Sequence, residues 1–301
     1  MLASAANERW VAQIAIAMLS AAEQTPGPPP CLLVDCGLAG SSLTALSTSF
    51  AHRGVTLHVL PADVAALRQL PADHTLGPET YARLDVPAWI AERAARTVYI
   101  DADTLSVGSV ERLASAELHG ATVGAVQDSR IPFVSDPQGV TSWQQLDLAP
   151  ATAYFNAGVL VIDNDRWVEG RCRELVLEFL ALHPGELAFA DQGALNAVLA
   201  NDWRPLDRRW NTLVAPAISA RDSISLVARL GLWPGAGQPA EGTILHFAGR
   251  VKPWHPNYAP SIQRWLYSRA WRRYAPFATP PRHLPARSWI RDPKLYEQRV
   301  G

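Results

Sequence analysis

The sequence predicts an α/β fold in which a mainly parallel sheet lies between layers of helices. Short apolar runs alternate with segments of helical periodicity along most of the chain, and this alternation favours parallel strand pairing. The chain has 301 residues, of which 48% are hydrophobic. A core of that size suits one large domain or two small ones. We find no internal repeat in the sequence.

The individual elements are predicted from their hydrophobic patterns. Short, mostly apolar runs predict strands at 31–36, 56–60, 97–100, 121–128, 157–163 and 243–247. Apolar residues at helical spacing predict helices at about 9–22, 40–52, 86–95, 171–183, 190–200 and 260–274. Residues 129–153 show little periodicity and hold several prolines, so we expect a long loop, and such loops are often lids.

Composition excludes several classes of protein. Lys and Arg total 27 against 28 Asp and Glu, so no basic field points to a nucleic-acid partner. Cys31 and Cys36 would face opposite sides of one strand and Cys172 lies far away, which argues against a disulfide framework or a zinc site. The apolar stretch 10–22 is too short to span a bilayer, and no targeting segment is evident. We therefore expect a cytoplasmic protein.

Two carboxylates directly follow the predicted strand 97–100. Asp101 and Asp103 are separated only by Ala102, and side chains at this spacing can point the same way. Two neighbouring carboxylates repel each other unless a cation lies between them. Oxygen ligands suit Mg²⁺ or Mn²⁺, which often complete their coordination with substrate phosphates. The pair alone fits a metal that holds a diphosphate, and it also fits a solvated turn.

Later segments carry further polar groups at the ends of predicted elements. Asn156 precedes a buried strand in YFNAGVLVID, where small neighbours allow a ligand to approach the backbone. Asp191 and Gln192 open a predicted helix in DQGALN, where a carboxylate also complements the helix dipole. These positions are candidates for substrate contact.

The segment HFAGRVKPWH begins at the end of the last predicted strand. Its His246 is either a buried structural residue or a metal ligand. Gly249 and Lys252 follow it and offer a backbone N–H group and a cation for a phosphate. This combination favours the ligand interpretation.

Taken together, these segments resemble the family 8 glycosyltransferases, the retaining group that includes bacterial lipopolysaccharide galactosyltransferases and glycogenin. The resemblance covers about residues 1–256, with motifs in the family's order: TYARL, YIDADTL, YFNAGVLVID, DQGALN, RRWN and HFAGRVKPWH. It implies a GT-A fold, which is a Rossmann-like mixed sheet. It also implies a hexosyltransferase that moves galactose or glucose from a UDP-linked or other nucleotide-diphospho-sugar to a saccharide or other hydroxyl acceptor.

The resemblance also implies roles for individual residues. Asp101, Asp103 and His246 would ligate Mn²⁺ or Mg²⁺, and Gly249 and Lys252 would hold the phosphates. Arg83, Ala102 and Asp128 would belong to the donor-binding set. The catalytic group would comprise Asn156, Asp191 and Gln192, placed around the sugar and its anomeric carbon.

The N-terminal turn departs from the family pattern. The family carries an AADxxY-like turn, whereas this chain has AANERW. The resemblance implies that Ala6, Asn7 and Trp10 form the base pocket, with Trp10 replacing the stacking aromatic. Because Asn7 replaces the usual Asp, the identity of the base stays open.

The last 41 residues differ in composition from the rest. We expect a transferase domain at 1–260 and a basic, aromatic extension at 261–301, where nine basic residues against two acidic ones give a net charge of +7. One interpretation is a helix that caps the sheet. The other is peripheral contact with anionic lipid at the inner membrane face. Five prolines between 276 and 293 exclude a long continuous helix.

Two rival functions remain at this stage. A non-catalytic GT-A scaffold would not need all three of the predicted metal ligands. A sugar nucleotidyltransferase usually has a glycine-rich basic loop after its first strand, and AANERW contains no glycine. Both features favour the transferase.

Overall fold

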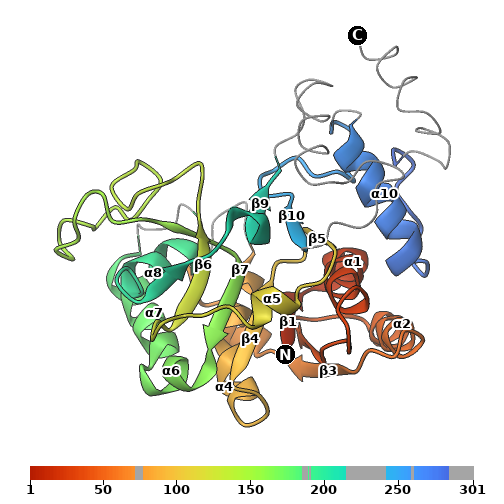
Figure 1. Cartoon of the computed structure of the whole chain (residues 1–301), viewed down its shortest axis with the longest axis horizontal. Coiled ribbons are helices and arrows are strands. Elements are labelled where there is room, and N and C mark those ends of the chain that lie inside the picture. Colours follow the sequence, from red (N-terminus) through yellow and green to blue (C-terminus); the bar gives the residue numbers. More distant parts are fainter. Residues whose placement is uncertain (72–76, 185–188, 190, 215–241, 259–260, 285–301) are drawn as a thin grey trace.

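Figure 1 shows a computed structural model of the chain, which describes residues 1–71, 77–184, 189, 191–214, 242–258 and 261–284. Its centre is a seven-stranded sheet in the order β3-β2-β1-β4-β7-β6-β8. In that order the strands are Leu57–Pro61, Cys31–Asp35, Leu2–Ala6, Arg96–Ile100, Phe155–Asp163, Val123–Gln127 and Trp203–Pro205.

The sheet is mixed and mainly parallel, as predicted. Strands β3, β2, β1 and β4 run parallel to one another, and β6 runs parallel to β8. Only β7 runs antiparallel to its neighbours, β4 and β6. The carboxyl ends of β1 and β4 therefore lie side by side, which places Asn7 and Asp101 at one edge, where α/β sheets bind ligands.

A small second sheet crosses this edge. It has the order β5-β10-β9, with bounds Thr104–Val107, Thr243–His246 and Thr212–Leu213. The chain passes from β4 to β5 through residues 101–103 alone. Strand β10 pairs antiparallel with β5, and His246 lies opposite Thr104 in the register. This pairing brings His246 next to the two aspartates.

Helices cover both faces of the large sheet (Figure 1). One hydrophobic cluster includes buried residues of α1 (Val11–Glu23), α2 (Gly40–Ala51) and α10 (Ile262–Tyr274). The other includes residues of α4, α6, α7 and α8, with bounds Val86–Ala91, Asn164–Glu169, Cys172–Leu182 and Asp191–Val198. The described residues also include shorter helical segments: α3, α5, η1, η2 and η3, at Val64–Leu67, Glu111–Ala114, Glu8–Trp10, Pro78–Asp85 and Arg208–Asn211.

Several predicted boundaries were wrong. The helix expected at 86–95 ends at Ala91, after which Arg93 and Ala94 close a turn on the Ile90 carbonyl. The helix expected at about 171–183 is confirmed to within one residue at each end, and it begins at Cys172 because Arg171 adopts a left-handed conformation with φ of 49°. Strand β7 begins two residues before the predicted start at 157, so Asn156 lies within the strand.

The cysteines match their prediction. Cys31 and Cys36 belong to clusters on opposite faces of the sheet, and all three cysteines are free and buried. Burial raises the pKa of Cys31 to about 12 and, with help from nearby carboxylates, that of Cys36 to about 12. These side chains therefore behave as small apolar groups in the core.

Residues 129–153 form an irregular segment without helix or strand, which in Figure 1 lies at the end of the molecule far from α10. It is anchored by Ile131, Val134 and Val140, which are buried in the core. An isolated bridge between Phe133 and Ala153 closes it at its base. The long loop is present, and its function as a lid stays a prediction.

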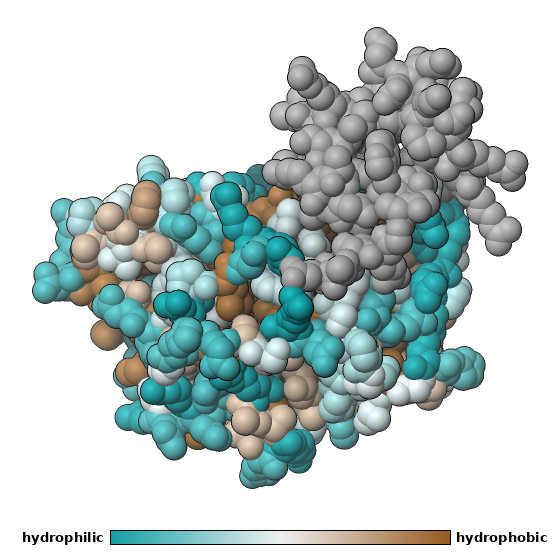
Figure 2. Space-filling model, viewed as in Figure 1, coloured by the Kyte–Doolittle hydropathy of each residue, from teal (hydrophilic) through white to brown (hydrophobic). Residues whose placement is uncertain are grey.

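Helix α10 lies against α1 (Figure 1). It buries Tyr267, Trp271 and Tyr274 in the same cluster as the apolar residues of α1. The capping interpretation therefore holds for residues 261–284, and residues 285–301 lie outside the described part. Figure 2 shows a largely hydrophilic face with apolar residues gathered near its middle. Among the described residues, no helix is long and apolar enough to cross a membrane.

Candidate metal and donor-binding site

The turn between β4 and β5 holds the two aspartates in fixed positions. The backbone N–H of Asp101 donates to the Gly158 carbonyl at 2.8 Å, and the Asp101 carbonyl accepts from the Thr104 hydroxyl at 2.8 Å. Both strands are anchored in sheets on either side of this turn. The backbone therefore presents both carboxylates at the sheet edge.

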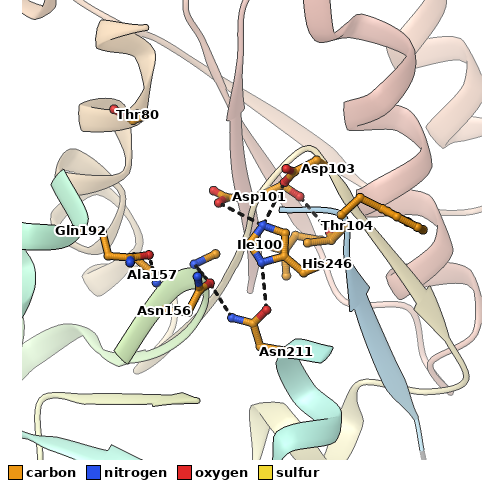
Figure 3. Close-up of polar contacts among 12 residues, drawn as sticks. Thr80, Ile100, Asp101, Asp103, Thr104, Asn156, Ala157, Gln192, Asn211 and His246 are labelled. Carbon is orange, nitrogen blue, oxygen red and sulfur yellow. Dashed lines mark hydrogen bonds and ion pairs between the residues drawn. The ribbon is translucent and has the colours of Figure 1, made fainter. Parts of the chain in front are cut away.

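His246 completes a group of three acceptor side chains (Figure 3). Its Nε2 atom lies 3.2 Å from Asp103 Oδ1 and 3.9 Å from Asp101 Oδ2. One ligand atom from each of the three residues lies within 4.8 Å of the other two. The structure thus brings together the three residues predicted as metal ligands.

The surroundings fit a divalent cation. Carboxylate oxygens and an imidazole nitrogen form a donor set that suits Mn²⁺ or Mg²⁺. Gly158 lies directly beneath this set: a Cβ atom there would be 2.7 Å from His246 Nδ1 and 3.0 Å from Asp101 Oδ2. Only glycine leaves room for both ligands to keep their positions.

Lys252 supplies a positive charge next to this group. Its Nζ donates to Asp103 Oδ2 and, at 2.8 Å, to the Phe247 carbonyl. Burial alone would raise the pKa of Asp103, but Lys252 and His246 together hold that pKa well below its usual range. The carboxylate is therefore ionised and ready to bind a cation.

Arg83 is buried and connects two carboxylates. Its Nη2 lies 2.9 Å from Asp101 Oδ1, its Nε lies 2.7 Å from Asp191 Oδ2, and its Nη1 donates to the Ala157 carbonyl at 2.6 Å. The guanidinium also lies 4.6 Å from the centre of the Tyr99 ring. Arg83 thus holds Asp101 and Asp191 in place, and its predicted contact with the donor stays a prediction.

Asp191 begins helix α8 and is almost completely buried. Burial raises its pKa to about 6, with Arg83 opposing the shift and Asp101 adding to it. The Arg83 Nε–H is directed at the Thr80 carbonyl, so despite the short distance Asp191 Oδ2 has no hydrogen bond among the described residues. This oxygen is held by its ion pair with Arg83.

Gln192 and Asn156 lie on the other side of the site. Gln192 Oε1 accepts from the Ala157 N–H at 2.9 Å, so the side chain is held against β7. Asn156 donates through Nδ2 to Asp128 Oδ2 at 2.9 Å. The predicted catalytic and sugar-binding residues therefore share one hydrogen-bonded surface around the ends of β6 and β7.

One residue of this surface was missed in the sequence. Asn211, the last residue of the RRWN motif, contacts His246 Nδ1 through Oδ1 at 2.9 Å and donates through Nδ2 to Asn156 Oδ1 at 2.8 Å. The motif marked the segment, but nothing in the sequence indicated which side chain it would contact.

The N-terminal turn forms a separate part of the site. Asn7, directly after Ala6 at the end of β1, caps the following 3₁₀ turn by accepting from the Arg9 N–H, and it donates to Glu79 Oε1 at 2.7 Å. The Trp10 ring meets Trp254 edge-on at 5.7 Å, and Lys252 Nζ lies 6.0 Å from the Trp10 ring centre. Trp10, a member of the predicted base pocket, thus lies near Lys252 beside the metal-binding group.

Two predicted donor-binding positions are defined mainly by backbone. Gly249 has a φ of 107°, which an L side chain rarely adopts, and its nearest neighbour across space is Arg130. Ala102 lies between the two aspartates and is partly buried. At both positions a ligand would meet backbone N–H groups and little side chain.

Comparison with known proteins gives a consistent result. The sequence profile described as "Glycosyl transferase family 8" matches residues 40–257. Among curated proteins, the chain is 27% identical over 228 residues to general stress protein A of Bacillus subtilis (strain 168), covering 75% of this chain and 76% of that protein.

Two lipopolysaccharide enzymes are also similar to the chain. It is 25% identical to the 1,2-glucosyltransferase of Escherichia coli (strain K12), covering 67% of this chain and 56% of the enzyme. It is 25% identical to the 1,3-galactosyltransferase of Salmonella typhimurium (strain LT2), covering 64% of this chain and 54% of that enzyme. The chain thus spans little more than half the length of these two enzymes.

Solved structures support the fold. The galactosyltransferase LgtC, crystallised with donor and acceptor sugar analogs, superposes with a TM-score of 0.72, covering 93% of this chain and 97% of that one at 21% identity. The bifunctional glycosyltransferase WbbM gives a TM-score of 0.63 at 20% identity, covering 89% of this chain and 51% of that one. The predicted GT-A arrangement of the sheet is confirmed.

Proposed function

The chain belongs to glycosyl transferase family 8, and from that premise we propose that it transfers a hexose from a nucleotide-diphospho-sugar to a hydroxyl acceptor with the help of a divalent metal. The observation that carries this proposal is the grouping of Asp101, Asp103 and His246 beside Lys252 at the carboxyl edge of the sheet. A scaffold protein would have no use for three buried or half-buried acceptors aimed at one point.

The donor diphosphate would lie against this group. Mn²⁺ or Mg²⁺, held by the three acceptors, would neutralise charge on the leaving diphosphate. Lys252 reaches the same point, so exchanging Asp103 for a phosphate oxygen would let its ammonium group stabilise the leaving group as well. Gly249 would present its backbone N–H to the phosphates, since no side chain covers it there.

The sugar would lie between the metal group and helix α8. Asp191, whose position Arg83 fixes through an ion pair, would accept from a sugar hydroxyl. The family-matched position beside the anomeric carbon holds the amide of Gln192, which is a weak nucleophile. We therefore propose that the acceptor oxygen attacks on the leaving-group side and that configuration is retained.

The base would lie against Trp10. We propose uracil as the base, because the turn that follows β1 matches the family turn in position and keeps an aromatic side chain. Asn7 replaces an acid in that turn, and Glu79, at 2.7 Å, returns a carboxylate to the same place. The acceptor would be a saccharide, with residues 129–153 beside it.

A panel of nucleotide sugars tests this function. Melting temperatures are measured for the protein with UDP-galactose, UDP-glucose and GDP-mannose, each with Mn²⁺ and with chelator. We expect stabilisation by one UDP-hexose that requires the metal, because a ligand that binds only the folded state raises its stability. Asp103→Asn is the matched control and should lose the shift. Stabilisation of the same size in chelator would contradict the metal's part in the proposal.

A further inference from the structure

A chain of four buried side chains connects Asp128 to His246 behind the metal-binding group. We propose that Asn211 is a positioning residue that fixes His246 as a metal ligand, and that Asn156 and Asp128 set the direction of its hydrogen bonds. The inference rests on the proposed metal-dependent function. Figure 3 shows Asn211 between Asn156 and His246.

Asn156 sets the donor-to-acceptor direction of these hydrogen bonds. Its Nδ2 group meets Asp128 Oδ2 at 2.9 Å, and a carboxylate oxygen accepts a hydrogen bond. Its Oδ1 atom meets the backbone N–H of Gly158 at 3.0 Å, and a backbone N–H can only donate. Both ends of this amide are therefore fixed independently, and a flipped Asn156 would face two mismatched partners.

The orientation of the Asn156 amide also fixes the orientation of the Asn211 amide. Because Asn156 presents its oxygen, Asn211 must approach it with Nδ2, at 2.8 Å. The Asn211 oxygen then faces His246 Nδ1 at 2.9 Å and can only accept. His246 therefore carries a hydrogen on Nδ1, which leaves Nε2 as the ring nitrogen that faces the aspartates and would ligate a metal.

Burial makes this arrangement rigid. All four side chains are at least 95% inaccessible to solvent. An unpaired polar group in such surroundings is costly, so the alternative orientations are disfavoured. The backbone is tied in the same way, because Leu213, two residues after Asn211, pairs with His246 in the small sheet.

Asn211 is not a ligand itself, yet it should determine metal affinity. A histidine ligand almost always donates its second ring N–H to a protein acceptor, and loss of that acceptor typically costs about 10- to 100-fold in metal affinity or activity. Here the acceptor is the neutral amide of Asn211. Its orientation depends on Asn156 and, through Asn156, on Asp128. Asn211, the last residue of the RRWN motif, would thus orient the metal ligand His246.

Metal affinity of three variants tests the role. Mn²⁺ binding to the full chain without donor is measured by the loss of the free-ion signal in electron paramagnetic resonance. We expect Asn211→Leu to weaken binding about 10- to 100-fold. Asn211→Asp should weaken binding less than Asn211→Leu does, because a carboxylate still accepts from the Nδ1–H although it loses the bond to Asn156 Oδ1.

The matched control is Asn164→Leu. Asn164 is equally buried, and its amide accepts from the Thr97 hydroxyl and donates to the Ala94 carbonyl, at the opposite end of β4 from the aspartates. This variant should lower the melting temperature as much as Asn211→Leu and leave Mn²⁺ affinity unchanged. A general loss of stability would instead weaken metal binding in both variants.

A spectroscopic signal separates positioning from packing. In the Co²⁺-loaded protein, a histidine bound through Nε2 gives one shifted, exchangeable N–H proton signal from Nδ1. We expect this signal in H₂O for wild type, its loss through fast exchange in Asn211→Leu, and its return at a different shift in Asn211→Asp. The Asp variant keeps the size of the side chain, so it tests the contact even where the Leu variant does not fold.

The outcomes are distinct. Equal Mn²⁺ affinity in wild type and Asn211→Leu, or an N–H signal that does not respond to Asn211→Asp, would overturn the role of Asn211 and leave the metal site standing. Failure of wild type to bind Mn²⁺ or Co²⁺ would overturn the proposed metal-dependent function and this inference together.

Discussion

Single residues at the sheet edge decide whether the site can hold a cation. Asp101, Asp103 and His246 come from the ends of two different sheets, and their acceptor atoms meet only because a four-residue strand follows β4 immediately. Two cationic side chains, Arg83 and Lys252, already pair with these carboxylates. These two cations offset part of the negative charge before any ligand arrives, and Arg83 is shared with a third carboxylate, Asp191.

Gly158 should be as necessary as the ligands. We expect Gly158→Ala to reduce Mn²⁺ affinity at least about 10-fold, because its Cβ would lie 2.7 Å from His246 Nδ1 and displace a ligand. The control is Gly124→Ala, which places a Cβ 2.6 Å from Leu118 in the core, away from the site. It should cost stability and keep the affinity, measured by calorimetric titration. Equal affinity in both variants would contradict the packing argument.

Asp191 should make stability depend on pH. Its pKa is raised to about 6 in the folded protein, mainly by burial, so the folded state binds the proton more tightly than the unfolded state does. Stability should therefore fall as the pH rises from about 4 to about 6, by roughly 2–3 kcal/mol from this residue.

Urea unfolding of wild type and Asp191→Asn across that pH range measures the effect. Relative to wild type, the Asn variant should gain stability as the pH rises, because it has no proton to lose. A constant difference between the two proteins from pH 4 to pH 7 would contradict the raised pKa.

At the scale of elements, the sequence predicted the long and strongly patterned segments best. The buried strand at 97–100 and the helix at 40–52 appear within one residue of their predicted bounds. Strands β5, β8 and β9 have only two to four residues, and they form because a partner strand lies beside them. Strands this short have no hydrophobic pattern from which the sequence alone could predict them.

The site was likewise predictable only in part. Motif spacing led to the aspartates and His246, because these residues follow strands whose patterns are clear. It did not predict that Arg83 would hold Asp101 and Asp191, or that Asn211 would contact His246. Those contacts join segments 18 to 108 residues apart, so only the packed structure sets them.

Helix α10 should stabilise the fold through its buried face. We expect Trp271→Ala to lower the free energy of unfolding by about 3–5 kcal/mol, because the ring is buried against the core and its Nε1 donates to the Ala278 carbonyl. Trp265→Ala, on the half-exposed face of the same helix, is the control and should cost far less. Similar losses in urea unfolding would show that α10 is not packed as described.

At the scale of the whole molecule, the question is what the basic extension at residues 261–301 contacts. The exposed arginines of α10 include Arg269, and further basic residues lie beyond the described part. We propose that residues 261–301 contact anionic lipid, since clustered basic residues with interfacial aromatics bind such surfaces. Attachment would place the site near an acceptor that is itself membrane-bound.

Vesicle sedimentation tests this attachment. The full chain should co-sediment with vesicles that contain phosphatidylglycerol, less so at high salt, and not with neutral phosphatidylcholine vesicles. A variant with glutamine at positions 282, 287, 291, 294 and 299 keeps the packed part of α10 and should stay in solution. Equally weak sedimentation of both proteins would leave the extension with its capping role only.

The proposed mechanism requires Asp103 to hold a metal that neutralises charge on the diphosphate of a sugar nucleotide. The most direct measurement is the release of nucleoside diphosphate from UDP-galactose or UDP-glucose by the full chain, with Mn²⁺ or with chelator, compared between wild type and Asp103→Asn. We expect metal-dependent release by wild type and a loss of at least about 100-fold in the variant, as for removal of a key electrostatic group. Release by the variant or in chelator at the wild-type rate would contradict the account.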